Sequence, residues 1–203
     1  MNTSEKAKDE KVNLRRLQIL VAARKCIIQH GFHATTMSQI SDLSGLSVGV
    51  IYRYFSNKEE LINEIVKEIV NKRLKMITAL NIDLIEMSDM LTDRLGMQRL
   101  DSDFVTDNIL MFEVLAEVRR NEHVAAIFKD ADVRMSDVLL SKFMAFQPKK
   151  NLDIVKAQVE IMMELFYGSD IRSFVKREMN DERLRELHDD VLSSLFKVKI
   201  KRK

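Results

Sequence analysis

The chain has 203 residues, of which 46% are apolar, and this is enough to form a substantial core and to exclude a disordered polypeptide. Five glycines, one proline and no tryptophan leave a composition dominated by good helix formers, which favours an all-α fold. The net charge of +2 hides an asymmetry, because residues 1–75 carry 13 Lys and Arg against 8 Asp and Glu, whereas the remainder is acidic. A basic N-terminal segment slightly favours attraction to phosphate backbones.

No segment of the sequence predicts export or membrane insertion. No uninterrupted apolar run approaches the roughly 20 residues of a membrane span, and residues 1–11 are too polar and charged for a secretory signal. A single cysteine, Cys26, cannot form an intramolecular disulfide and is compatible with a reducing compartment. We therefore expect a cytoplasmic protein that has no membrane partner.

A first helix is predicted over residues 11–30. Apolar residues recur there with the 3.6-residue period of a helix that buries one face. Gly31 follows where a helix ends in a left-handed residue, and Phe32 is expected to pack back on the last turn. The apolar stripe consists of Leu14, Leu17, Leu20, Val21, Ile27 and Ile28.

Two short helices separated by a glycine turn are predicted next. Thr35 and Thr36 offer cap hydroxyls for a helix of about two turns, which Gly45 ends. Ser47 is expected to cap a second short helix over residues 48–55. This arrangement predicts a helix-turn-helix, with Ile40, Leu46, Ile51, Phe55 and Leu61 as structural residues.

A long helix is predicted from Asn57, which is expected to be its cap. Glu60, the third residue of that helix, is expected to reach back to the N–H of Asn57, as in a capping box. The apolar face of this helix continues through Leu61, Ile62, Ile65, Ile69 and Leu74.

The second short helix is the candidate to enter the major groove of DNA. Val48, Gly49, Val50 and Arg53 are predicted on its exposed side, and Arg53 is the only one that can bind guanine in a bidentate way. The predicted DNA-binding set also includes Ser47 at the start of this helix, with Thr36, Tyr52, Tyr54 and Lys58 as phosphate contacts. The alternatives for Thr36, Tyr52 and Lys58 are a helix cap, a core residue and an ordinary solvated residue, respectively.

Residues 35–61, TTMSQISDLSGLSVGVIYRYFSNKEEL, resemble the DNA-binding signature of TetR-type (tetracycline-repressor) regulators. The shared features are the cap, the glycine turn, the aromatic pair, the basic residue and the leucine at the corresponding spacing. The resemblance implies a flexible arm over residues 1–11, a helix-turn-helix domain over 12–75, and a ligand-binding and dimerisation domain over 76–203. It further implies a ligand-responsive regulator, most often a repressor, that binds a palindromic operator in double-stranded DNA as a homodimer.

The remainder of the chain keeps helical periodicity. Helices are predicted over 82–95, 102–120, 121–146, 152–176 and 181–197, which brings the total to about nine. The predicted breaks are at Gly96, Asn121, Pro148 and Asn180. Residues 113–122, at the end of the second of these ranges and the start of the third, are similar to a pattern in the BetI-like subgroup of the family, from which no ligand is inferred.

The last two helices carry more apolar residues than one chain can easily bury, which predicts pairing with the same helices of a second copy. The dimer-interface candidates are Val155, Val159, Met163, Leu184, Leu187, Val191 and Leu195.

A pocket for an unknown small-molecule effector is predicted among apolar and aromatic residues of the C-terminal helices. The alternative is that these residues form ordinary core, since they recur at helical spacing. Arg119 and Arg172 are candidates to face an anionic ligand, against the alternative of a solvated helix face. The pocket candidates are Phe104, Met111, Phe112, Leu115, Phe128, Phe143, Met162, Phe166 and Tyr167.

Patterns typical of enzymes are absent from the sequence. None of the four histidines has a glutamate three residues before it, and the metalloprotease, Walker, dinucleotide-loop and nucleophile-elbow patterns are missing. We therefore expect no catalysis, no cofactor and no metal. The alternative function is a helical-bundle interaction protein of the same fold that no longer reads DNA. The basic tail, 197–203, is expected to be a mobile, solubilising end.

Overall fold

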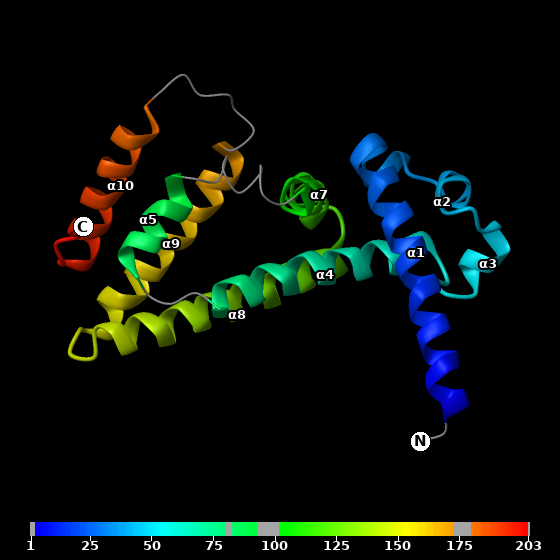
Figure 1. Ribbon diagram of the computed structural model, residues 1–203, viewed down its shortest axis with the longest axis horizontal. Coiled ribbons are helices and arrows are strands. Elements are labelled where there is room, and N and C mark those ends of the chain that lie inside the picture. The colour runs from blue at the N-terminus through cyan, green and yellow to red at the C-terminus, as the bar shows by residue number, and fades with distance from the viewer. Residues whose placement is uncertain (1–2, 80–82, 93–101, 173–179, 203) are drawn as a thin grey trace. The chain divides into compact units, whose positions relative to one another are not determined.

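The computed structural model describes residues 3–79, 83–92, 102–172 and 180–202, with residues 3–8 and 102–106 described by their backbone only. Within these ranges the chain forms nine α-helices and no strand, which confirms the all-α prediction (Figure 1). The helices are α1 (Thr3–Ala34), α2 (Met37–Ser44), α3 (Val48–Tyr52), α4 (Lys58–Ala79), α5 (Leu84–Thr92), α7 (Ser102–Val118), α8 (Glu122–Phe146), α9 (Leu152–Arg172) and α10 (Asp181–Phe196).

The helices pack into two compact units. Unit 1 consists of Met1–Asn71 and Thr106–Phe128, and unit 2 consists of Lys72–Val105 and Lys129–Lys203. The helices α4, α7 and α8 contribute residues to both units. The division of the chain into functional domains at residues 75 and 76 stays a prediction, because these units are defined by packing and not by function.

Helix α1 is longer than the sequence predicts. It begins at Thr3, so residues 3–11, expected as a flexible arm, are helical. The predicted end at Gly31 is a kink with a positive φ (φ 77°, ψ 168°), after which a further turn continues to Ala34. Phe32 is 2% exposed and lies in the core, while its predicted packing on the last turn of the helix stays a prediction.

The single apolar stripe predicted for α1 is wrong, because its members lie on two faces. Leu20 and Ile27 are buried, whereas Leu14, Leu17 and Val21 are exposed. A helix turns by about 100° per residue, which places these three on the side away from the core. The buried face of α1 is formed by Ile19, Leu20, Ala22, Ala23, Cys26 and Ile27.

The core of unit 1 joins α1 to the helix-turn-helix and to α4. Ile40, Ile51, Phe55 and Leu61 are each 0% exposed, which confirms their structural assignment, whereas Leu46 is only partly buried. Full burial of such a side chain stabilises a fold by about 1.5–3 kcal/mol relative to exposure. The helix-turn-helix is therefore held mainly by these contacts.

Asparagines begin three of the later helices. The Oδ1 atoms of Asn121, Asn151 and Asn180 accept backbone N–H groups from the first turns of α8, α9 and α10, respectively. These bonds satisfy donors that a helix leaves without internal partners. The breaks predicted at Asn121 and Asn180 are confirmed, and Lys197, the residue that follows α10, adopts the left-handed conformation (φ 57°).

The core of unit 2 is formed by α5, α8, α9 and α10. Its fully buried members include Met87, Leu139, Phe143, Met162 and Phe196. The rings of Phe143 and Phe196 pack edge to face with centroids 4.9 Å apart. The predicted ends of α5 and α9, at residues 95 and 176, lie outside the described residues, as does Gly96. Among the described residues, none of the helices combines the length and the hydrophobicity that a membrane span requires.

Candidate nucleic-acid interface

The turn between α2 and α3 is fixed by side chains of α2. Thr36 caps α2 as predicted: its Oγ1 accepts the Gln39 N–H (3.3 Å), and the Gln39 side chain accepts the Thr36 N–H (2.8 Å). Gly45 ends α2 in the left-handed conformation (φ 67°, ψ 18°), which favours glycine. The Ser41 hydroxyl then donates to the Leu46 carbonyl (2.6 Å), so that the turn is tied back to α2.

Two predicted cap contacts are wrong. The Ser47 side chain makes no cap hydrogen bond, although its backbone is extended as a cap requires. The Glu60 carboxylate accepts hydrogen bonds from the N–H and hydroxyl of Ser56 (2.7 and 2.6 Å) rather than from Asn57. These bonds lower the pKa of Glu60, because they stabilise its charged form. The Asn57 Oδ1 accepts the Glu60 N–H (2.8 Å), which confirms the predicted cap of α4.

Helix α3 exposes two of its five residues, Gly49 and Tyr52, to solvent. It ends at Tyr52, earlier than predicted, and Arg53 follows as its C-cap. Gly49, Tyr52 and Arg53 are exposed, whereas Val48 and Val50 are partly buried. The guanidinium of Arg53 therefore stands at the C-terminal end of α3 and is open to a partner.

Gly49 lies in open space. A Cβ built on its backbone would meet no atom within 4 Å, so packing inside the chain does not require glycine here. Glycine inside a helix weakens the helix by about 0.5–1 kcal/mol relative to alanine. The absence of a side chain leaves the backbone of α3 accessible from outside.

Lys58 is engaged within the chain. Its ammonium group donates to the carbonyls of Phe32, His33 and Thr35 at 3.0, 3.1 and 3.1 Å. A lysine carries three donors, and all three are used at the end of α1. This placement favours a structural role for Lys58 over the predicted phosphate contact.

Arg16 and Gln18 of α1 support the helix-turn-helix and were missed by sequence reasoning. Gln18 donates to the Ser44 carbonyl at the end of α2 (2.6 Å), and Arg16 donates to the Tyr54 carbonyl beyond α3 (3.0 Å). The Arg16 guanidinium also lies 4.5 Å from the ring centroid of Phe55. Both short helices are thereby held at their C-terminal ends. In the sequence, Arg16 and Gln18 are distinguished only as polar residues among the apolar positions of the predicted first helix.

Helix α7 is attached to the end of α1 within unit 1. The Glu113 carboxylate accepts the Phe32 N–H (3.1 Å), and Glu117 Oε1 lies 2.9 Å from His33 Nε2. Glu113 and Glu117 both belong to the segment 113–122 that the sequence singles out. The acidic residues of this segment therefore contact the end of α1, next to the helix-turn-helix.

Arg24 forms a further ion pair between the same two helices. Arg24 of α1 contacts Asp107 of α7 at 3.0 Å and Glu68 of α4 at 3.4 Å. Asp107 is only 6% exposed, so this pair is shielded from solvent on one side. Burial raises the pKa of Glu68, and the positive charge of Arg24 partly offsets that rise.

The predicted pocket residues divide between the two units. Met111 is buried in unit 1, whereas Phe143, Met162 and Phe166 belong to the core cluster of unit 2. The side chain of Phe104 lies outside the described residues. Of the remaining candidates, Phe112, Leu115 and Phe128 are partly buried in unit 1 and Tyr167 is partly buried in unit 2.

Unit 2 contains a polar cluster that the sequence did not predict. Arg73 of α4 pairs with Asp170 of α9 at 2.7 Å, and Asp170 is 6% exposed. The Tyr167 hydroxyl donates to Asp132 of α8 (3.3 Å). Burial and, secondarily, the charge of Asp132 raise the pKa of Tyr167 to about 12. Arg172, a candidate for anion binding, is exposed at the end of α9.

The predicted dimer residues are split between core and surface. Val155, Val159 and Met163 are 0–7% exposed and are covered by their own chain, so they do not present a free face. Leu187 and Val191 are 48% and 45% exposed. Leu184 and Leu195 are partly buried. The large apolar residues that α9 leaves exposed are Leu152, Ile154, Ile161 and Ile171.

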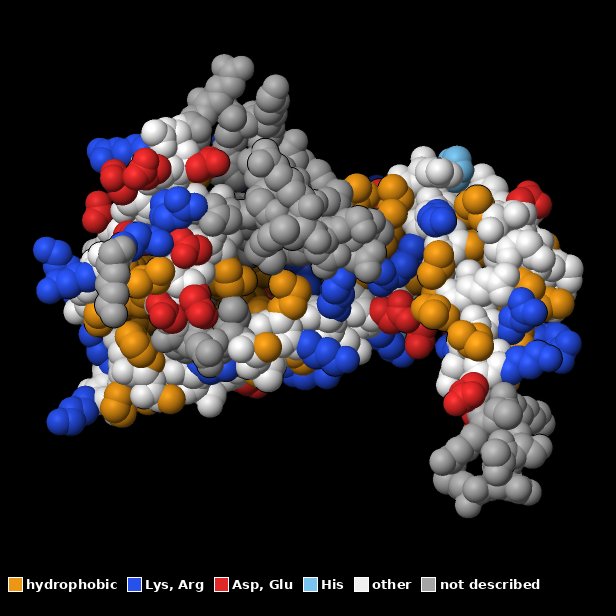
Figure 2. Space-filling model, in the orientation of Figure 1, with side chains coloured by type: hydrophobic (Ala, Val, Ile, Leu, Met, Phe, Trp, Pro, Cys, Tyr) orange, Lys and Arg blue, Asp and Glu red, His pale blue; other side chains and the backbone are white. Residues whose placement is uncertain are grey.

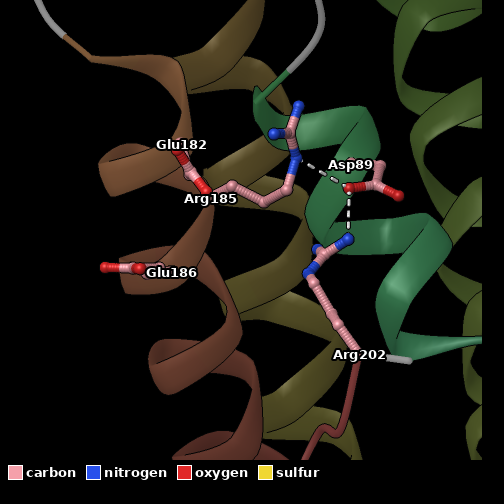
Figure 3. Close-up of a pocket in the computed structure, with 5 residues that line it drawn as sticks. All are labelled: Asp89, Glu182, Arg185, Glu186 and Arg202. Carbon is pink, nitrogen blue, oxygen red and sulfur yellow. Dashed lines mark hydrogen bonds and ion pairs between the residues drawn. The ribbon is translucent and has the colours of Figure 1, made fainter.

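The basic tail is bound to unit 2, unlike the mobile end that the sequence predicts. Arg202 donates to both Asp189 oxygens (2.6 and 2.8 Å) and to Asp89 (2.8 Å), and Arg185 donates to the same Asp89 oxygen (3.0 Å). Figure 3 shows both guanidinium groups converging on Asp89. Glu182 and Glu186 complete the wall of a polar cavity of about 430 Å³.

Comparison with known proteins identifies the helix-turn-helix region. The sequence model of the family described as "Bacterial regulatory proteins, tetR family" matches residues 19–65. The HTH-type transcriptional regulator UidR of Escherichia coli strain K12 is 28% identical over 156 residues, which cover 75% of this chain and 78% of UidR. The HTH-type transcriptional repressor AcnR of Corynebacterium diphtheriae is 27% identical over 138 residues, which cover 60% of this chain and 73% of AcnR.

Solved structures have the same fold. Salmonella enterica GusR superposes with a TM-score of 0.67 at 24% identity, covering 90% of this chain and 95% of GusR. The transcriptional regulator FadR of Bacillus subtilis, solved in complex with stearoyl-CoA, has a TM-score of 0.58 at 21% identity, covering 89% and 97%. The capped helix-turn-helix lies inside the matched residues, so residues 19–65 carry the DNA-binding region of the tetR family of bacterial regulatory proteins, and related transcriptional regulators align over most of the chain.

Proposed function

We propose that this protein is a ligand-responsive transcriptional repressor that binds a palindromic operator as a homodimer and is released by a small-molecule effector. The observation that carries the proposal is the open face of α3, on which Gly49 and Arg53 are exposed without a packing reason for glycine. A recognition helix needs such a face, since its backbone and side chains approach the floor of the major groove. The reading unit is the predicted domain 12–75.

Sequence discrimination rests on Arg53 in this proposal. Its guanidinium supplies two donors for the O6 and N7 atoms of guanine, while Val48 and Val50 offer apolar contact to thymine methyl groups. Tyr52 and Tyr54 hold phosphates on either side. The phosphate set is completed by Ser47 and by Thr36 at the N-terminus of α2, where free N–H groups attract anions.

A homodimer is supported by the apolar residues that α9 and α10 leave exposed. Ile154 and Ile161 of α9 and Leu187 and Val191 of α10 are 40–49% exposed. Pairing of the two helices with those of a second copy would bury these side chains in a four-helix bundle. A two-fold dimer then presents one recognition helix to each half of a palindrome.

An effector site in the domain 76–203 is supported by the family's relatives. FadR of Bacillus subtilis was solved with stearoyl-CoA bound, so a regulator of this fold accommodates a small molecule. Tyr167 and its apolar neighbours Met162 and Phe166 on α9 are the candidates to contact an effector here. A ligand that prefers one arrangement of the dimer shifts the population of that arrangement and so weakens operator binding.

The experiment that tests the reading function is selection of bound duplexes from a random pool. Wild-type protein, Arg53→Ala and the matched surface variant Arg183→Ala are compared at low salt. We expect a palindromic consensus for the wild type and for Arg183→Ala. In Arg53→Ala, we expect one base pair per half-site to lose about 1–3 kcal/mol of discrimination.

Failure of the wild type to enrich any sequence would contradict the proposal. A fluorescence titration with random duplex then shows whether nonspecific DNA binding remains, because a protein that no longer binds DNA at all shows no salt-dependent binding. That result would favour the alternative, an interaction protein that keeps the fold.

A further inference from the structure

Helix α1 carries a second apolar face that its own chain leaves uncovered. Leu14, Leu17 and Val21 are 65%, 54% and 45% exposed, and Leu43 of α2 beside them is 51% exposed. Figure 2 shows hydrophobic side chains at the surface over α1. They border a groove of about 510 Å³ in unit 1, whose lining is completed by Gln18, Ala22, Lys25 and Ser44.

The exposed face is a straight stripe with opposite charges at its two ends. At about 100° per residue, Glu10, Leu14, Leu17, Val21 and Lys25 fall within an arc of roughly 80° on α1. Glu10 and Lys25 are both exposed and both belong to α1. From the N-terminal to the C-terminal end of the stripe, one acidic residue is followed by three apolar residues and one basic residue.

This order makes the stripe complementary to itself. The midpoint between Glu10 and Lys25 falls between Leu17 and Gln18. A two-fold axis at that midpoint brings Leu14 opposite Val21 of the partner subunit and Glu10 opposite Lys25 of the partner subunit. Both ends then form ion pairs, while the leucines and valines pack between them. We propose that α1 pairs in antiparallel fashion with α1 of a second copy of this chain.

The pairing rests on the proposed homodimer. Stable interfaces bury on the order of 1,200 Å² or more, and a stripe of a few side chains falls short of this. Two chains that are already joined through α9 and α10 hold the second contact at a high effective concentration, so a weak interface forms. Its two-fold axis matches the symmetry of a palindrome, and the pairing thus fixes the separation of the two recognition helices.

Chemical cross-linking tests this contact in the full-length protein. Leu17→Cys places a thiol next to the axis, and Val12→Cys places one about 140° away on the same helix. Cys26 is 0% exposed, so the introduced cysteine is the accessible one. With a short bis-maleimide, we expect a covalent dimer from Leu17→Cys and little from Val12→Cys.

Charge reversal identifies the partner. In the Leu17→Cys background, Glu10→Lys is expected to slow cross-linking about five- to tenfold, because two ion pairs become two repulsions. The double variant Glu10→Lys/Lys25→Glu is expected to restore the rate, and the control Lys11→Glu, which lies off the stripe, to leave it unchanged.

Light scattering on the same samples separates the possible failures. A protein that is dimeric but cross-links equally from both cysteines, or ignores the charge reversals, overturns the α1 pairing and leaves the proposed homodimer intact. A monomer that does not cross-link overturns both. A dimer with the expected charge pattern establishes the contact.

Discussion

Lys58 and Gly49 show how differently two residues of one motif behave in the folded chain. Lys58 donates to three carbonyls at the end of α1, whereas a Cβ added to Gly49 would meet no atom within 4 Å. Contacts within the chain account for a lysine at position 58, whereas no contact within the chain requires a glycine at position 49. Their substitutions therefore separate folding from DNA binding.

Lys58→Met removes three donors and keeps most of the side chain's apolar volume. Carbonyls at the end of α1 lose a charged partner, and we expect the free energy of unfolding to fall by about 1–3 kcal/mol. Urea denaturation measures this loss. A variant of wild-type stability with a lower salt dependence of DNA binding would instead show that Lys58 is a phosphate contact.

Gly49→Ala is expected to have the opposite profile. Because its added methyl group meets no atom in the chain, the helix gains about 0.5–1 kcal/mol of stability. Operator affinity is expected to fall at least severalfold, since the methyl group lies where the DNA backbone or a base edge would approach. Unchanged affinity for the selected operator, measured by anisotropy, would mean that α3 does not dock through this face.

At the scale of elements, the sequence predicted what depends on local chemistry. Thr36, Gly45 and Asn57 cap or end their helices as predicted, because a cap requires only a residue and its near neighbours. The exposure of Leu14 and Leu17 was not predictable, since an apolar stripe does not reveal which part of it finds a partner. Contacts between distant segments, such as Arg16 with Tyr54, likewise depend on packing that no local pattern encodes.

The C-terminal tail gives a pH-dependent prediction for an element. Hydrogen bonds from Arg202 hold the pKa of Asp189 below its ordinary value. This stabilisation is present above the ordinary pKa and is lost as the pH falls through the lowered one. In Arg202→Gln, we expect about 1 kcal/mol less stability than wild type at pH 5. The two proteins should converge as the pH falls below 3, which acid titration of urea midpoints measures. A difference that persists at low pH would show that Asp189 is not the responsible partner.

At the scale of the whole molecule, burial separates residues that hold one chain together from residues that can join two. Val159 is 2% exposed and Val191 is 45% exposed, although both were predicted at the same interface. The proposed homodimer does not by itself choose between these two residues. A pair of variants makes that choice.

Val191→Glu is expected to yield a folded monomer. The charge lies on an open face, so the stability of the single chain changes by about 0.5 kcal/mol or less, while the dimer dissociates. Val159→Glu buries a charge in the core of unit 2 and is expected to unfold it. Circular dichroism and light scattering report both properties. A Val191→Glu protein that remains dimeric would place the interface elsewhere.

The three asparagines at the starts of α8, α9 and α10 have a consequence for the ageing of the protein. Asparagine is chemically labile and loses its amide over time, especially when heated. At these positions the aspartate product keeps the oxygen that accepts the N–H groups of the first turn, and its negative charge suits the positive end of a helix. The isoaspartate product, in contrast, lengthens the backbone by one methylene group at the cap, so only conversion to aspartate leaves the starts of these helices intact.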